Sequence, residues 1–219
     1  MDILVDLDGT LVDPKPGLIG SIQYALGKLG VPVPPANDLL WMIGPPFRVS
    51  FPKLLGRSDL TEDAIAYYRE CYFSGGMYDA VVYDGVPAAL DALCAAGCRL
   101  LIATAKPHYY ARPILERFGL APRFAGIYGP ELDGTRDHKH DLIAHIIACE
   151  GVRPDAAIMI GDREHDVLAA ARNGMPAIGV TWGYGSAHEL ATAGAAVLCN
   201  APGELAATAL TVLKGEHVA

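Results

Sequence analysis

The strongest constraint on the fold of this chain is a regular alternation of apolar runs and amphipathic segments that begins near residue 86. Short apolar runs at 100–103, 124–128, 157–160 and 176–180 are separated by stretches with helical periodicity. Strands that alternate with helices of this length are typical of a parallel sheet with helices on both faces. We therefore predict an α/β protein built on a Rossmann-like, doubly wound parallel sheet.

A segment of different character separates the first predicted strand from this alternation. Ile3–Val5 is an apolar run that ends in acidic residues, and helical periodicity with proline-rich breaks follows it. Proline and glycine near both ends of this segment suit two linkers. We predict a small all-helical cap domain at residues 14–82, inserted after the first strand of a catalytic core that comprises residues 1–13 and 83–219.

The composition favours a soluble globular protein that does not bind nucleic acid or membranes. Of the 219 residues 52% are apolar and 19% are charged, and the net charge is −8. An acidic protein repels nucleic-acid backbones and anionic membranes, and no apolar run approaches the roughly 20 residues of a membrane span. We expect the first strand to begin at the second residue, which would leave no room for a basic leader. We expect a cytoplasmic monomer or weak homodimer.

Polar side chains stand where several predicted strands end. Apolar runs lead directly into Asp6, Thr104 and Asp162, and Lys139 opens the helix that follows a fourth strand. Ligands of open parallel sheets bind outside the carboxyl ends of the strands. The sequence therefore predicts that these four residues, far apart along the chain, meet at one edge of the sheet.

The same residues carry a resemblance to a known family. The segment DLDGTLVD at 6–13 resembles the first motif of the haloacid dehalogenase superfamily. Thr104, Lys139 and GDREHD at 161–166 resemble its second, third and fourth motifs in the same order. The resemblance covers essentially the whole chain when the insert is counted as the helical cap. The segment 159–185 is similar to the phosphoglycolate phosphatase-like branch.

The candidate catalytic residues suit phosphoryl transfer. Asp6 can attack phosphorus and form an acyl phosphate, and Asp8 can protonate the leaving group and later deprotonate the attacking water. The resemblance implies that an aspartate at this second position favours phosphatases and phosphomutases over dehalogenases and cation-pumping ATPases. Thr104 and the N–H of Ala105 would bind a phosphate oxygen. Lys139 would place a fixed charge against the nucleophile and the phosphate.

Magnesium is the expected cofactor. Mg²⁺ is a hard ion that prefers carboxylate and phosphate oxygens, and we expect side-chain oxygens from Asp6 and Asp162. The resemblance implies that Asp8 contributes its backbone carbonyl and that Asp166 holds a water bound to the metal. The expected metal site thus consists of Asp6, Asp8, Asp162 and Asp166.

Two further basic residues are expected to lie nearer the margin of the site. Arg48 ends a predicted loop at 44–48, and its guanidinium offers a bidentate fork for a carboxylate or phosphate. We expect it to contact the non-reacting end of the substrate when the cap closes. The alternative interpretation is a surface arginine at a helix start. Lys106 is expected to face solvent or to lie at the rim.

The sequence thus predicts a magnesium-dependent phosphatase that passes through an aspartyl-phosphate on Asp6. Its expected partner is a small phosphorylated metabolite, either phosphoglycolate-like or a nucleoside monophosphate. One alternative is a phosphomutase of the β-phosphoglucomutase type, which must exclude water and hold a bisphosphate. The other is a non-catalytic binding or regulatory relative, against which the intact set of motif residues argues.

Overall fold

A computed structural model describes residues 1–215, and the chain divides into two compact units. The core unit comprises residues 1–12 and the chain from residue 82 onward, and the cap unit comprises residues 13–81. The last four residues of the core range expected from the sequence lie outside the described residues.

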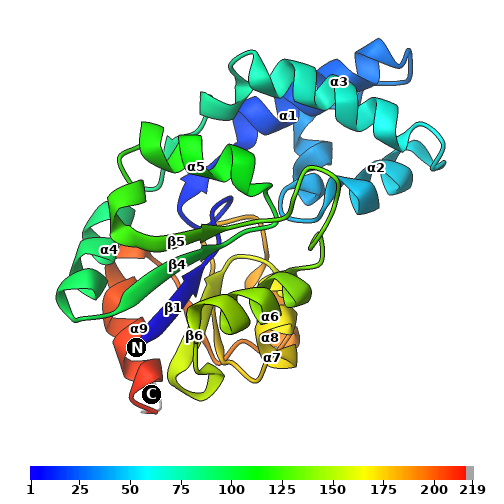
Figure 1. Ribbon diagram of the computed structural model, residues 1–219. Coiled ribbons are helices and arrows are strands. Elements are labelled where there is room, and N and C mark those ends of the chain that lie inside the picture. The colour runs from blue at the N-terminus through cyan, green and yellow to red at the C-terminus, as the bar shows by residue number, and fades with distance from the viewer. Residues whose placement is uncertain (216–219) are drawn as a thin grey trace. The chain divides into compact units, whose positions relative to one another are not determined.

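The core unit is built on a six-stranded sheet in which every strand pair is parallel. The strand order is β5-β4-β1-β6-β7-β8, so the first strand lies in the interior of the sheet (Figure 1). This confirms the predicted doubly wound α/β fold. The strands are β1 (Asp2–Val5), β4 (Arg99–Ala103), β5 (Phe124–Tyr128), β6 (Ala157–Gly161), β7 (Ala177–Val180) and β8 (Val197–Cys199).

Helices cover both faces of this sheet. Helices α6 and α7 pack against each other on one face, and α4 and α9 pack against each other on the other (Figure 1). Among residues 1–215, no helix is long and apolar enough to cross a membrane. The core helices are α4 (Val86–Ala95), α5 (His108–Arg117), α6 (Lys139–Glu150), α7 (Glu164–Arg172), α8 (Ala187–Thr192) and α9 (Leu205–Leu213). Short 3₁₀ turns are η3 (Ala121–Arg123), η4 (Pro154–Ala156) and η5 (Pro202–Glu204).

After a charged first residue in β1 and β4, the central strands are apolar and buried, because both of their faces are covered. All five residues of β6 are buried, as expected for parallel strands between two helical layers. On the α6 and α7 face, Leu4, Leu101 and Met159 join one core cluster with Leu142 and Ile146 of α6. These buried strands give the residues at their carboxyl ends a rigid base.

The cap unit is helical, as predicted. Its elements are α1 (Lys15–Lys28), η1 (Ala36–Met42), α2 (Phe47–Leu55), α3 (Thr61–Phe73) and η2 (Gly76–Tyr78). Helices α1 and α3 pack against each other. Where the chain leaves and re-enters the core, β2 (Val12–Asp13) pairs with β3 (Val81–Val82) in a two-stranded sheet.

One local prediction in the cap is wrong. The loop expected at 44–48 ends at Pro46, and Phe47 and Arg48 form the first turn of α2. Phe47 packs on Phe51 one helical turn later, with ring centroids 5.4 Å apart, and on Tyr68 of α3 at 4.4 Å. This aromatic packing favours a helix that begins at Phe47. Pro46 does not oppose it, because proline is well tolerated at the start of a helix.

A polar cluster ties the core strands to the end of α6. Arg99 donates from Nε to Asp2 Oδ1 at 2.8 Å and from Nη1 to Glu150 Oε2 at 3.1 Å. The Tyr128 hydroxyl donates to Glu150 Oε1. Burial, reinforced by the Glu150 carboxylate, raises the pKa of Tyr128 to about 12. The neutral phenol is therefore favoured in the folded state.

This cluster predicts a loss of stability at high pH. In the unfolded chain the tyrosine ionises near its ordinary pKa of about 10, whereas in the folded protein Tyr128 keeps its proton until about pH 12. Its contribution is therefore complete below about pH 10 and is lost as the pH rises through about 12. The melting temperature of the wild type should fall more steeply over this range than that of Tyr128→Phe. Parallel pH profiles of the two proteins would contradict this assignment.

Candidate active site

Three strand ends define the site. Asp6 follows β1, and its N–H donates to Ile160 O of β6 at 2.9 Å. Thr104 follows β4, and its N–H donates to Tyr128 O of β5 at 3.1 Å. Asp162 follows β6 directly. Because β4, β1 and β6 are neighbours in the sheet, the three polar residues lie at adjacent carboxyl ends, the usual location of ligand sites in such folds.

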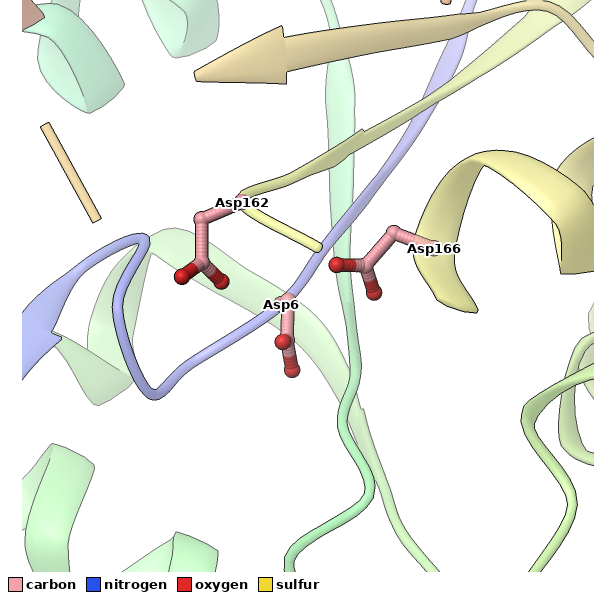
Figure 2. Close-up of side chains that lie close together, drawn as sticks. All are labelled: Asp6, Asp162 and Asp166. Carbon is pink, nitrogen blue, oxygen red and sulfur yellow. The ribbon is translucent and has the colours of Figure 1, made fainter. Parts of the chain in front are cut away.

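A group of three buried carboxylates lies at this edge. Asp6, Asp162 and Asp166 each offer an oxygen atom, and these oxygens lie within 4.8 Å of one another. Figure 2 shows the side chains converging from the end of β1, the end of β6 and the first turn of α7. All three are at most 3% exposed. A compact set of oxygen donors suits a hard divalent cation such as Mg²⁺.

Lys139 joins this group from the first position of α6. Its Nζ lies 3.0 Å from Asp6 Oδ1 and also donates to Asp166 Oδ1. Burial alone would lower the pKa of Lys139, but the charges of Asp166 and Asp6 together outweigh it and raise that pKa. The lysine is therefore a fixed cation between two carboxylates.

The prediction that Lys106 faces solvent or lies at the rim is wrong. Its side chain is only 6% exposed, and its Nζ lies 2.9 Å from Asp8 Oδ1. The chain turns back after β4, where the Lys106 N–H donates to Thr104 Oγ1 at 3.2 Å. Burial raises the pKa of Asp8, and the charge of Lys106 opposes that rise. Ala105 lies half-buried between Thr104 and Lys106, and contact of its N–H with phosphate stays a prediction.

Asp162 is held by partners that the sequence analysis did not identify. The N–H of Tyr184 donates to Asp162 Oδ2 at 2.8 Å, and Thr10 Oγ1 donates to Oδ1 at 3.4 Å. Trp182 Nε1 in turn donates to Thr10 O at 3.0 Å. Gly9 has a φ of +80°, and a Cβ there would lie 2.2 Å from Asp162 Oδ2. Only glycine fits this approach of the first motif to the fourth.

The carboxylate group carries an excess of negative charge. Burial, together with repulsion from Asp166 and Asp6, raises the pKa of Asp162 well above its ordinary value. Burial also raises the pKa of Asp166 to about 6, although the Lys139 charge opposes the rise. With Asp8 included there are four buried carboxylates and two buried ammonium groups. When all six groups are charged, the carboxylates outnumber the ammonium groups, and a divalent cation would neutralise this excess negative charge.

Arg48 pairs with an acidic residue inside the cap unit. It donates from Nε to Glu62 Oε1 at 3.0 Å and from Nη2 to Oε2 at 3.3 Å. Its role toward substrate stays a prediction.

Arg136 lies in the core segment that leads into α6 and adopts a left-handed φ of 67°. Its Nη2 donates to Glu131 Oε1. Nothing in the sequence indicated this backbone conformation.

The buried charges predict a large effect of Lys139 on stability. Lys139→Met should lower the free energy of unfolding by about 3–5 kcal/mol in metal-free buffer, because it leaves buried carboxylates without their counter-charge. Chemical denaturation monitored by circular dichroism measures this. Lys214→Met, which alters an exposed lysine, is the matched control and should be nearly neutral. Adding Asp166→Asn to Lys139→Met should restore part of the loss, and a double variant as unstable as the sum of the singles would contradict the electrostatic explanation.

Comparison with known proteins places these features in one family. Residues 3–180 match the family model described as haloacid dehalogenase-like hydrolase. A 5'-nucleotidase of Pseudomonas aeruginosa is 45% identical over 190 residues, which are 86% of this chain and 86% of the relative. A phosphoglycolate phosphatase of Agrobacterium fabrum is 33% identical over 83% of this chain and 80% of the relative.

Two further similarities concern a kinase and a solved structure. Tyrosine-protein kinase PtkA of Mycobacterium tuberculosis is 38% identical over 84% of this chain, which corresponds to 63% of that protein. The crystal structure of a predicted phosphatase from Clostridium acetobutylicum superimposes with a TM-score of 0.93 at 40% identity. That superposition covers 95% of this chain and 97% of the other.

Proposed function

Because this chain belongs to the haloacid dehalogenase-like hydrolase family, we propose that it is a magnesium-dependent phosphatase that hydrolyses a small phosphomonoester through an aspartyl-phosphate on Asp6. The observation that carries the proposal is the buried group of Asp6, Asp162 and Asp166 with Lys139 against it. A nucleophile, a hard-metal donor set and a fixed cation thus share one edge of the sheet.

The donor set fits magnesium on chemical grounds. Its three carboxylates are hard oxygen ligands, and no sulfur or imidazole belongs to the group. When bound, Mg²⁺ would neutralise the charge of the phosphate and of the carboxylates that face it. Asp6 and Asp162 would hold it with side-chain oxygens, with the Asp8 carbonyl and Asp166 as further contributors. Tyr184 and Thr10 fix the orientation of the Asp162 carboxylate.

The first chemical step forms the acyl phosphate. A carboxylate oxygen of Asp6 attacks phosphorus, and the bond from phosphorus to the leaving oxygen breaks. Asp8 gives its proton to that oxygen, so the alcohol leaves neutral. Lys139 stands against Asp6 and stabilises the negative charge on the phosphoryl group during transfer. Thr104, at the neighbouring strand end, would hydrogen-bond a phosphate oxygen.

The second step regenerates the enzyme. A water oxygen attacks the phosphorus of the aspartyl-phosphate while Asp8, now ionised, takes the water proton. The bond between phosphorus and the Asp6 oxygen breaks and releases inorganic phosphate. The same carboxyl group thus acts as acid and then as base. Asp8 lies two residues after the nucleophile in the same loop, within reach of the same phosphoryl group.

Two substrate classes are supported by the relatives. The name 5'-nucleotidase of the Pseudomonas relative suggests a nucleoside 5'-monophosphate, and the name of the Agrobacterium relative suggests phosphoglycolate. The higher identity, 45% against 33%, favours the nucleotide. Both are small phosphomonoesters. A panel of phosphorylated metabolites that contains both classes would rank them by kcat/KM.

The proposed mechanism predicts a requirement for both the metal and Asp6. Phosphate release from an aryl phosphate should need Mg²⁺ and stop with a chelator, and Asp6→Asn should lower kcat by at least about 10³-fold because its amide cannot serve as the nucleophile. Asp155→Asn alters an exposed aspartate outside the site and is the matched control, expected to keep wild-type turnover. Near-wild-type turnover by purified Asp6→Asn would remove Asp6 from its role.

The acceptor of the phosphoryl group separates hydrolysis from its alternatives. A phosphatase releases inorganic phosphate in the same amount as the alcohol. A phosphomutase would return the group to a sugar phosphate, and a kinase would transfer it from a nucleotide to an acceptor such as tyrosine. Incubation with ¹⁸O-labelled water should place one labelled oxygen in each released phosphate. Transfer to an added acceptor without labelled phosphate would overturn hydrolysis as the main reaction.

The proposed substrate contact of Arg48 can be tested by kinetics. The pair with Glu62 is half-exposed, so its loss costs at most about 1 kcal/mol and leaves Arg48 able to exchange partners. Arg48→Ala should raise KM for phosphoglycolate about tenfold, the effect of one charge-assisted contact worth about 1.4 kcal/mol. KM for an aryl phosphate without a second anionic group should not change. Arg57→Ala removes another acid-paired cap arginine and is the matched control; equal KM values in both variants would move the role elsewhere.

A further inference from the structure

We propose that Lys106 is a positioning residue of the reaction, which holds the Asp8 carboxylate where it exchanges a proton with the leaving group and then with water. This inference rests on the proposed function, because it assigns Lys106 to the acid and base step. It gives a role to a buried lysine that the mechanism above does not use.

The two buried lysines of the core site contact different carboxylates. Lys139 contacts Asp6 and Asp166, whereas the Nζ of Lys106 lies 2.9 Å from Asp8 Oδ1. The side chains of this second pair are 6% and 10% exposed. With Oδ1 held by the ammonium group, Oδ2 is the atom assigned to proton exchange. Asp6 and Asp8, the two carboxylates with proposed chemical roles, are therefore each paired with a different lysine.

The turn after β4 is built to present Lys106 to Asp8. The Lys106 N–H donates to Thr104 Oγ1, which fixes the backbone two residues after the strand-end position. Gly129 packs against the same turn, where a Cβ would lie only 2.1 Å from Lys106 O. The His108 N–H donates to Pro130 O at 3.3 Å and ties the turn to the next loop. The stem of Lys106 thus leaves a backbone that is held from two sides.

Asp8 needs such a partner because its neighbour repels it. The loop backbone is fixed, since the N–H of Gly9 donates to Val12 O at 2.8 Å. The negative charge of Asp6, two residues earlier, acts on the Asp8 carboxylate. A cation on one oxygen selects a single orientation beside the nucleophile. If Lys106 only compensated the charge of Asp8, its role would be structural. A positioning role differs because it affects the proton-transfer step.

Leaving-group dependence is the decisive measurement. An alkyl phosphate needs protonation of its leaving oxygen, whereas a nitrophenyl phosphate has a leaving group that departs as an anion. Lys106→Met should lower kcat on the alkyl phosphate by about 100-fold, the scale of general acid catalysis, and on the aryl phosphate by less than about fivefold. Lys106→Arg, which keeps the charge, should recover part of the alkyl activity. Equal losses on both substrates would overturn the positioning role.

A double variant gives an independent test that does not require Lys106→Met to fold. If Lys106 acts only through Asp8, removing Lys106 should have no further effect once Asp8 is changed. The variants Asp8→Asn and Asp8→Asn/Lys106→Met should then have the same kcat on the alkyl phosphate within about twofold, the usual precision of such comparisons. A further loss of tenfold or more in the double variant would overturn the proposal. Lys214→Met, at an exposed lysine, is the control for the substitution itself.

The same measurements distinguish failure of this inference from failure of the proposed function. The proposed function requires that Asp8→Asn itself lose more activity on the alkyl phosphate than on the aryl phosphate. If Asp8→Asn loses both equally, Asp8 is not the general acid and the role of Lys106 falls with it. If Asp8→Asn behaves as expected and Lys106→Met does not, only the assignment of Lys106 is wrong.

Discussion

The mutual repulsion of four carboxylates buried at one edge of the sheet is the constraint on which the rest of this structure depends. Asp6, Asp8, Asp162 and Asp166 are all at most 7% exposed. An unpaired buried charge costs several kcal/mol, and a partner repays this only with good geometry. The fold meets the requirement with two buried lysines, Lys106 and Lys139. The negative charge that they leave is one that a divalent cation would neutralise.

The parallel sheet is what makes such crowding possible. Asp6 and Asp162 follow neighbouring strands whose backbones are locked together, since the Asp6 N–H donates to Ile160 O. The close approach also requires the absence of side chains. A Cβ at Gly9 would overlap Asp162, and one at Gly161 would lie 2.2 Å from Asp166 Cγ. Rigid strands and bare backbone together hold like charges at distances that a flexible loop would not maintain.

These physical causes explain which parts of the site the sequence predicts. Asp6, Thr104 and Asp162 each follow an apolar run, and the topology of a parallel sheet then brings strand ends together, so local pattern and fold class suffice. Lys106 also follows one of these runs, but its direction depends on a turn closed by the Thr104 hydroxyl and packed against Gly129. That packing is tertiary and leaves no periodic signal. The sequence therefore predicts the polar residues at the strand ends, but it does not predict that Lys106 is buried against Asp8.

The partners of Asp162 were beyond sequence analysis for a different reason. The bond from Tyr184 comes from its backbone N–H, which any residue but proline carries, so the residue type does not predict this contact. Likewise, the first turn of α2 was missed because the packing of Phe47 on Tyr68 joins two segments of the cap. The hydrophobic pattern predicts which residues are apolar, but it does not predict which distant residues pack against them.

The division of the chain into two units separates the buried charges from the aromatic packing of the cap. Every carboxylate and lysine of the proposed site belongs to the core unit, whereas Arg48 and the aromatic packing of α2 and α3 belong to the cap unit. Changes in the cap would therefore leave the balance of buried charge in the core intact. The electrostatics of the buried charges therefore restrict the residues of the core unit, whereas the residues of the cap unit are free of that constraint.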